Sequence, residues 1–274
     1  MSGLTDEALA MLLAEAEGLL ASGQSEDAER ALRGGLKRWK GHRDLTFLLG
    51  DALRDQGRLD EAAGLYRGIV ISAPTDSDAW SALASALLYQ LRWTEAAKAA
   101  NRAIREDPGH PEASYVRAVL RERRGDYAGA QRDFIRAASA SPRIWPLPVP
   151  LDDETVETVV TEMLEALHPT LREYLADIPI ILEEFPSDEA LRHYDPPAYP
   201  TELLAYFSGH SLMERSLDDP WSGMPGAIVL FRRNLQRFAQ NRAQLLDELR
   251  ITLLHEVGHF LGLSEGDLED RGLD

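Results

Sequence analysis

The chain of 274 residues contains no cysteine. Disulfide bonds and thiolate metal sites are therefore excluded, and the lack of cysteine is typical of a reducing cytoplasm. No apolar run approaches the roughly twenty residues that a membrane-spanning helix needs, and residues 1–7 lack the basic region of a secretory signal. We therefore expect a soluble, cytoplasmic protein that does not work in a membrane.

Lysine is absent from residues 151–274, where 9 arginines face 25 acidic residues, whereas residues 1–150 carry 20 basic and 21 acidic residues. Phosphate binding needs clustered positive charge, so nucleic acid is not expected as a partner. The acidic field favours cationic peptides and metal ions, although solubility alone also explains it. We expect two members of the small basic cluster, Arg233 and Arg237, to share a helix face and pair with Asp247 and Glu248.

Proline concentrates where the charge changes, with four prolines in residues 141–150. Such a segment cannot continue a helix and favours an extended spacer. The sequence therefore predicts a first domain over residues 1–142, a proline-rich linker over residues 143–150 and a second domain over residues 151–274.

The first domain shows an internal repeat of 34 residues. The columns that share this step are Pro74, Pro108 and Pro142; Ala62, Ala96 and Ala130; Gly50, Ala84 and Ala118; Tyr66, Ala100 and Phe134; and Gly57, Leu91 and Gly125. The step is the period of tetratricopeptide repeats, in which small residues let two antiparallel helices approach and proline ends each unit. With a degenerate first unit, the sequence predicts an all-α solenoid of about four helix pairs, which offers a groove for a peptide or a protein partner.

A metal motif stands near the end of the chain, in the run His255-Glu256-Val257-Gly258-His259. Side chains four residues apart share one face of a helix, so His255 and His259 can offer two imidazole nitrogens to one ion. Glu256 lies at the edge of such a site and can take a proton from water that zinc acidifies. The apolar neighbours Leu253 and Phe260 predict that this helix is built into a core.

A third ligand is expected just after the helix. Gly262 can adopt the left-handed conformation that ends a helix and turns the chain back. Glu265 lies three residues later, at the spacing of the third ligand in metzincin-type sites, and is our candidate. Asp267 remains the alternative.

On these residues and on the segments 178–186, 203–209 and 224–231, roughly the last 120 residues resemble the minimal zincin-like metallopeptidases of bacteria. The resemblance implies a small zincin-like α+β domain with Zn²⁺ as cofactor. The family pattern ends H-E-x-x-H-x-x-G-x-x-D, with the aspartate as third ligand. This chain has Glu265 at that position, which keeps the carboxylate but lengthens the side chain by one methylene.

The rest of the second domain is expected to be mixed α and β. The sequence predicts helices over residues 154–167, 169–175 and most of 235–263, and strands over residues 178–184, 203–207 and 227–231. Either of the last two strands can lie at the sheet edge that binds an extended substrate. Tyr206 and His210 are weaker candidates for donating a hydrogen bond to an oxyanion, His193 and Tyr194 rank below them, and Trp221 can close over the cleft or join the core.

The sequence thus predicts a zinc metalloendopeptidase that cleaves proteins or peptides, with His255, His259 and Glu265 as ligands and Glu256 as the catalytic base. Two roles of the repeats fit the sequence equally well. They can capture a substrate, or they can hold the enzyme inactive until a partner binds. The alternative is a tetratricopeptide binding scaffold whose metallopeptidase-like domain is latent or inactive.

Overall fold

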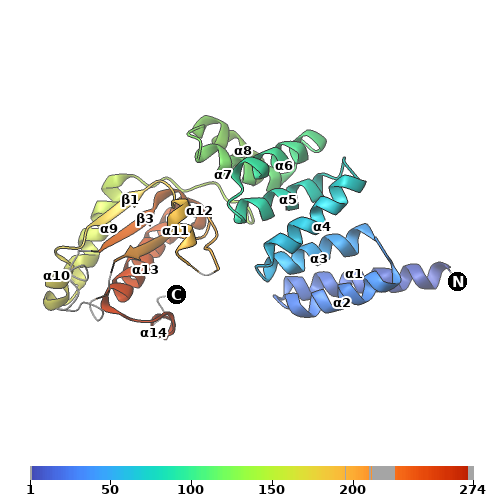
Figure 1. Ribbon diagram of the computed structural model, residues 1–274. Coiled ribbons are helices and arrows are strands. Elements are labelled where there is room, and N and C mark those ends of the chain that lie inside the picture. The colour runs from blue at the N-terminus through green and yellow to red at the C-terminus, as the bar shows by residue number, and fades with distance from the viewer. Residues whose placement is uncertain (1, 195, 210, 212–225, 271–274) are drawn as a thin grey trace. The chain divides into compact units, whose positions relative to one another are not determined.

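The computed structural model describes residues 2–194, 196–209, 211 and 226–270 (Figure 1). The chain divides into two compact units, Met1–Trp145 and Pro146–Asp274. Two of the weaker candidates, His210 and Trp221, lie outside the described residues. Among the helices described, none is both long enough and apolar enough to cross a membrane.

The first unit is a solenoid of helix pairs, as the 34-residue repeat predicts (Figure 1). Successive helices pack against each other, and the first helix of each pair also contacts the first helix of the next. The helices are α1 (Ser2–Ala21), α2 (Ser25–Arg38), α3 (Arg43–Asp55), α4 (Leu59–Ser72), α5 (Ser77–Tyr89), α6 (Trp93–Glu106), α7 (Pro111–Glu122) and α8 (Tyr127–Ala140).

The repeated small residues mark the close approach of helices. Tyr66 of α4 is fully buried, and a Cβ added at Gly50 of α3 would lie 2.5 Å from its ring. The turn between the paired helices needs a left-handed residue, which Gly57 supplies at φ 74°. Leu91 stands in the same column and adopts φ 59°, a strained conformation for a side chain with a Cβ.

In the last helix pair, arginines occupy positions at which the preceding pair has buried leucines. Leu83 and Leu87 are buried in α5, and the residues 34 positions later are Arg117 and Arg121. Both arginines bind Asp133 of α8, which is 1% exposed, at 2.7 and 2.8 Å, and Arg136 binds it at 2.6 Å. A repeat array needs a polar outer face at its end, and this network provides one.

The second unit contains a three-stranded sheet in the order β1-β3-β2 (Figure 1). The strands are β1 (Ile180–Glu183), β2 (Ala205–Ser208) and β3 (Ala227–Phe231). β1 pairs with β3 in parallel and β2 pairs with β3 antiparallel. β3 is therefore central, and its two faces alternate in the period of two that a strand imposes.

One face of the sheet carries the main core. Ile228 and Leu230 of β3 join a buried cluster with Leu249 and Leu253, whereas Val229 and Phe231 pack in a small cluster on the other face. The helices of this unit are α9 (Asp153–Ala166), α10 (Pro169–Leu175), α11 (Asp188–Arg192), α12 (Arg232–Phe238), α13 (Arg242–Leu261) and α14 (Glu265–Glu269). α13 contacts β2, β3 and α9, so the predicted motif helix lies in the core.

Residues 235–263 are mostly helical, as predicted, but the helical residues belong to two helices. α12 ends at Phe238, and α13 begins after Asn241, whose side-chain oxygen accepts the backbone N–H of Gln244 at 3.0 Å. An asparagine that caps a new helix competes with continuation of the old one. The predicted pairing of Arg233 and Arg237 with Asp247 and Glu248 was wrong, because Arg233 binds Glu184 at 2.7 Å and Arg250 takes Asp247 at 3.5 Å.

Candidate functional site

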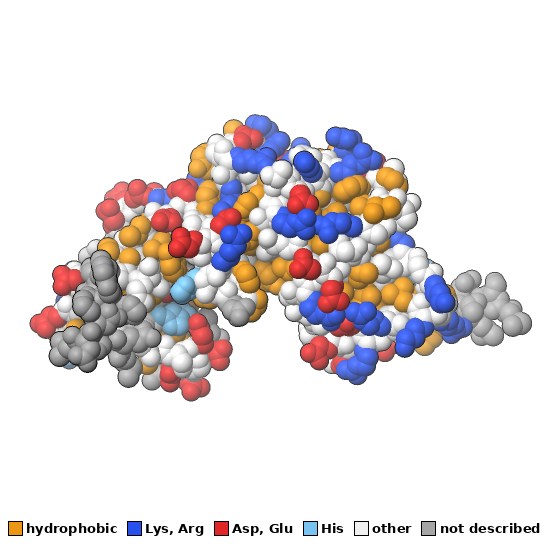
Figure 2. Space-filling view, in the orientation of Figure 1, with side chains coloured by type: hydrophobic (Ala, Val, Ile, Leu, Met, Phe, Trp, Pro, Cys, Tyr) orange, Lys and Arg blue, Asp and Glu red, His pale blue; other side chains and the backbone are white. Residues whose placement is uncertain are grey.

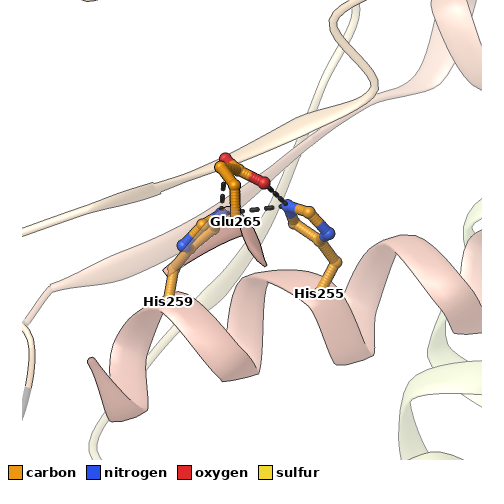
Figure 3. Close-up of side chains that lie close together, drawn as sticks. All are labelled: His255, His259 and Glu265. Atoms are coloured by element: carbon orange, nitrogen blue, oxygen red, sulfur yellow. Dashed lines mark hydrogen bonds and ion pairs between the residues drawn. The ribbon is translucent and has the colours of Figure 1, made fainter. Parts of the chain in front are cut away.

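The two histidines of the motif lie on one face of α13 and point toward each other (Figure 3). The Nε2 atoms of His255 and His259 are 2.9 Å apart. With a proton on Nδ1, His259 donates to the carbonyl oxygen of Leu263 at 3.3 Å, which leaves its Nε2 free to coordinate. Hydrogen bonding at the second ring nitrogen is typical of a histidine that binds metal.

The chain reverses immediately after α13. Gly262 ends the helix in the left-handed conformation at φ 90°, as its position predicts, and Ser264 then caps the short helix α14. Glu265 is the first residue of α14, and its carboxylate oxygens lie 3.4 Å from Nε2 of His255 and 3.3 Å from Nε2 of His259 (Figure 3). Three ligand atoms from two helices therefore lie within 4.8 Å of one another.

The alternative carboxylate, Asp267, forms hydrogen bonds at the start of α14. Asp267 forms a capping box with Ser264, accepting its backbone N–H at 3.0 Å and its hydroxyl at 2.6 Å. Each group of the box satisfies an otherwise free donor at the helix start. Glu265, rather than Asp267, joins the two imidazoles in the cluster of potential ligands.

Two residues that were not predicted as site residues hold α14 against α13. Leu268 is fully buried, and a Cβ added at Gly258 would lie 2.4 Å from its Cδ2 atom. Gly258 thus lets α14 approach the motif helix closely, and this approach positions Glu265. Small residues at helix contacts are a recognisable signal, but a single glycine in a sequence does not identify its partner.

The three side chains fit a zinc ion. Imidazole nitrogens and a carboxylate oxygen bind zinc at about 2.0–2.2 Å, so two ligand atoms of one ion lie roughly 3–3.5 Å apart. The separations of 2.9, 3.3 and 3.4 Å in this cluster are close to that range. The side chains of His255 and His259 are 22% and 27% exposed, which leaves one side of the cluster open to solvent and to a substrate.

Glu256 is buried beside this cluster and is 5% exposed. Its carboxylate accepts a hydrogen bond from the backbone N–H of Phe207 in β2, while its Oε2 atom has no hydrogen-bond partner among the described residues. Burial raises the pKa of Glu256 to about 8; the bond from Phe207 opposes the shift and the negative charge of Glu265 adds to it. A carboxylate of this kind is suited to taking up a proton.

The edge of the sheet borders the same site. Both sides of β3 are paired, so of the two candidate edge strands it is β2 that lies at an edge of the described sheet. A cavity of about 270 Å³ is lined by His255, Glu256, His259 and Glu265 together with Ala205 of β2. A peptide laid along β2 would thus pass the cluster of potential ligands.

Two of the weaker candidates lie in different surroundings. Tyr206 stacks on Phe231 at 5.9 Å between ring centroids and belongs to the small cluster on the far face of the sheet. Tyr194, ranked low by sequence, lines the cavity, and burial together with the charges of Glu256 and Glu265 raises its pKa to about 12. A loop residue of this kind carries no periodic signal, so its position could not be read from the sequence.

Comparison with known families gives a match within each of the two units. The family model of zincin-like metallopeptidases matches residues 175–273, and that of the tetratricopeptide repeat matches residues 13–77 and 81–143. The protein therefore joins tetratricopeptide repeats to a zincin-like metallopeptidase domain, as its sequence predicts.

Several solved structures are similar to part of the chain. A crystal structure of MamA is 22% identical, with 46% of this chain and 74% of that chain covered and a TM-score of 0.41. MamA from Desulfovibrio magneticus RS-1 is 20% identical over 47% of this chain and 72% of that chain, with a TM-score of 0.42. YrrB, described as a TPR protein with an unusual peptide-binding site, is 19% identical over 47% of this chain and 66% of that chain, with a TM-score of 0.40. No curated protein matches the chain.

Proposed function

We propose that the protein is a zinc-dependent metalloendopeptidase that cleaves peptide bonds in protein or peptide substrates. One observation supports the proposal above all others. His255, His259 and Glu265 lie close together in an open cavity that the buried Glu256 also lines. This donor set, two imidazoles and one carboxylate, is that of catalytic zinc sites that keep a position for water or substrate.

His255, His259 and Glu265 would hold the ion, which supplies a Lewis acid that polarises the peptide carbonyl and lowers the pKa of water. Glu256 then takes the proton of the attacking water at Oε2, the oxygen that has no partner among the described residues. Glu256 returns this proton to the nitrogen of the leaving amine. A bound dication also favours the ionised form of Glu256, which offsets the effect of burial on its pKa.

The edge strand would orient the substrate. Phe231 donates its N–H to the carbonyl of Leu204, so the backbone groups of alternate residues in β2 face β3. The groups of the residues between them, Ala205 and Phe207, face the other way, toward the site. Phe207 uses its N–H on Glu256, and the remaining groups can pair with an extended peptide.

The repeats would bring the substrate or a protein partner. Polar side chains connect α3, α5 and α7, the stacked first helices of three pairs. Arg54 lies 3.4 Å from Asp51 and 3.8 Å from Glu112. Ser85 donates a hydrogen bond to Glu112 at 2.7 Å. A continuous polar strip of this kind suits recognition of an extended chain. Residues 1–142 would form this array, residues 143–150 the linker and residues 151–274 the peptidase domain.

The linker is tied at both ends. Trp145 packs on Tyr115 with ring centroids 4.6 Å apart, and Val149 donates its N–H to the carbonyl of Gln236 at 2.7 Å.

We place the protein in the cytoplasm because it has no cysteine. The scaffold alternative, with a latent peptidase domain, is less well supported because every group that the chemistry needs is present in one cavity.

The test is Glu256→Gln in the full-length protein. We expect one zinc per chain by elemental mass spectrometry in both wild type and variant, hydrolysis of unfolded protein substrates by the wild type, and a loss of at least about a thousandfold in the variant. Glu173→Gln, which changes an exposed acid away from the cavity, is the matched control. Full activity in Glu256→Gln would refute the mechanism, and wild type without zinc after supplementation would favour the scaffold.

A further inference from the structure

The cavity beside the potential zinc ligands is acidic. Of its described lining residues, four are glutamates, namely Glu202, Glu248, Glu256 and Glu265, and none is lysine or arginine. The whole second unit shares this bias, and Figure 2 shows many acidic side chains on it and few basic ones. Two of the four, Glu202 and Glu248, have no part in the proposed chemistry.

These two glutamates approach the cavity from separate elements. Glu248, Thr252, His255 and His259 follow at steps of four, three and four residues, so they form one stripe along α13. Glu248 is two turns, about 10 Å, before His255 along the helix. Glu202 lies in the segment that leads into β2. Asn234 holds this segment by donating hydrogen bonds to the carbonyls of Pro200 at 3.0 Å and Leu203 at 2.6 Å.

Neither carboxylate forms an ion pair with the part of the chain that the structure describes. Among the described residues no arginine lies within 4.0 Å of Glu202 or Glu248, whereas Glu184 binds both Arg232 and Arg233. Burial raises the pKa of Glu202, and burial raises that of Glu248 against a hydrogen bond from Thr252. A partly desolvated carboxylate without a cation is unfavourable, and a bound cation relieves that cost.

An independent observation indicates that this cavity takes a ligand. Glu256 is 5% exposed, lines the same cavity, and its Oε2 atom lacks a partner among the described residues. Buried polar atoms are normally hydrogen-bonded, so an unpaired one in a cavity points to a partner that comes from outside the fold.

The other walls are apolar. Leu203, Leu204, Ala205 and Ile251 also line the cavity. Lysine and arginine side chains combine a long aliphatic stem with a cationic head, and they place the stem on apolar surface and the head with an acid. The lining of the cavity offers both features.

We propose that the cavity selects peptides that carry lysine or arginine close to the cleaved bond, with the cationic head paired to Glu248 and Glu202 and the stem on Leu204 and Ile251. This inference rests on the proposed peptidase function for its consequence, but it concerns binding and can be tested without cleavage. It relates the acidity of the second unit to one class of substrate, peptides that carry lysine or arginine.

The test uses full-length, zinc-loaded Glu256→Gln protein and fluorescein-labelled octapeptides of alanine and glycine. One lysine is moved along the peptide, and each peptide is matched by one with norleucine at the same position. Fluorescence polarisation should show one or more lysine positions that bind about tenfold more tightly than norleucine, the size of a partly buried ion pair.

Two double variants in the same background locate the effect. Glu202→Gln with Glu248→Gln should remove the lysine preference, and Glu173→Gln with Glu183→Gln, an equal charge change at exposed sites outside the cavity, should keep it. The proposal is overturned if no lysine position binds better than norleucine, or if the preference survives in the first double variant. Cleavage by wild type without a lysine preference would refute the inference alone, and lysine-dependent binding without cleavage would refute the peptidase function alone.

Discussion

The buried carboxylate of Glu256 accepts a hydrogen bond from the backbone N–H of Phe207. The contact joins the motif helix α13 to the edge strand β2, and the ring of Phe207 adds a second contact with Phe260 at 5.7 Å between centroids. The proposed base is therefore held by the same strand that would bind the substrate. A fixed distance between base and scissile bond follows from this arrangement.

Glu256→Asp should uncouple the two elements. The shorter side chain cannot both keep the bond to Phe207 and reach the attacking water, and a displacement of about 1 Å can cost on the order of a hundredfold in rate. We expect kcat to fall by about that factor while zinc content is unchanged. Equal kcat values for Glu256→Asp and wild type in a peptide assay would show that this contact does not position the base.

Mutation of the two carboxylates of α14 should have different effects on zinc affinity. Glu265→Ala removes a proposed ligand, and we expect zinc affinity to fall by more than about a hundredfold, the upper range for loss of an outer-shell partner. Asp267→Ala removes one half of the capping box, which costs about 1 kcal/mol of stability and leaves a ligand set intact. Competition with a zinc chelator measures both affinities, and the reverse order would make Asp267 the ligand.

Asp133→Ala should destabilise the repeats. The change leaves Arg117, Arg121 and Arg136 around a buried position without their common carboxylate, and breaking such a network costs about 3 kcal/mol. Urea unfolding of the full-length protein can be followed by tryptophan fluorescence, because four of the five tryptophans lie in the first unit. Asp126→Ala removes the cap of α8 and a 3.5 Å contact with Arg121 but leaves Asp133 in place, and it is the control at about 1 kcal/mol. Equal losses would contradict the prediction.

Asp51 should make the repeats less stable as the pH rises. Burial raises its pKa to about 6 from an ordinary value of 3.8, against the charge of Arg54 and the hydroxyl of Tyr66, which donates at 2.7 Å. Because the folded state holds the proton more tightly, the stabilisation is complete below about pH 3.8 and is lost as the pH rises through about 6. Between pH 5 and 7.5 the wild type should lose roughly 1–1.5 kcal/mol more than Asp51→Asn in urea unfolding. Parallel pH profiles for the two proteins would show that Asp51 titrates normally.

Much of the fold could be predicted because its signals are local. The 34-residue step places the same residue types at each helix contact, so the pairs from α1 to α8 follow from the sequence. The strands β1 and β3 lie within the apolar segments that predict them, and β2 overlaps its predicted segment but ends one residue later, at Ser208. The break before α13 was missed because the cap formed by Asn241 competes with an apolar period that continues across it.

The sequence by itself determined the chemistry that the site can hold. The steps from His255 to His259 and from Gly262 to Glu265 depend only on helix geometry and on one left-handed residue, and both are short-range. Only the tertiary structure places Glu265 rather than Asp267 beside the two histidines and β2 at the sheet edge. The entry of Tyr194 into the cavity, and the lack of an arginine near Glu248 among the described residues, also depend on tertiary structure. Each of these depends on which distant segments pack together, as Leu268 packs on Gly258, and that packing carries no periodic trace along the chain.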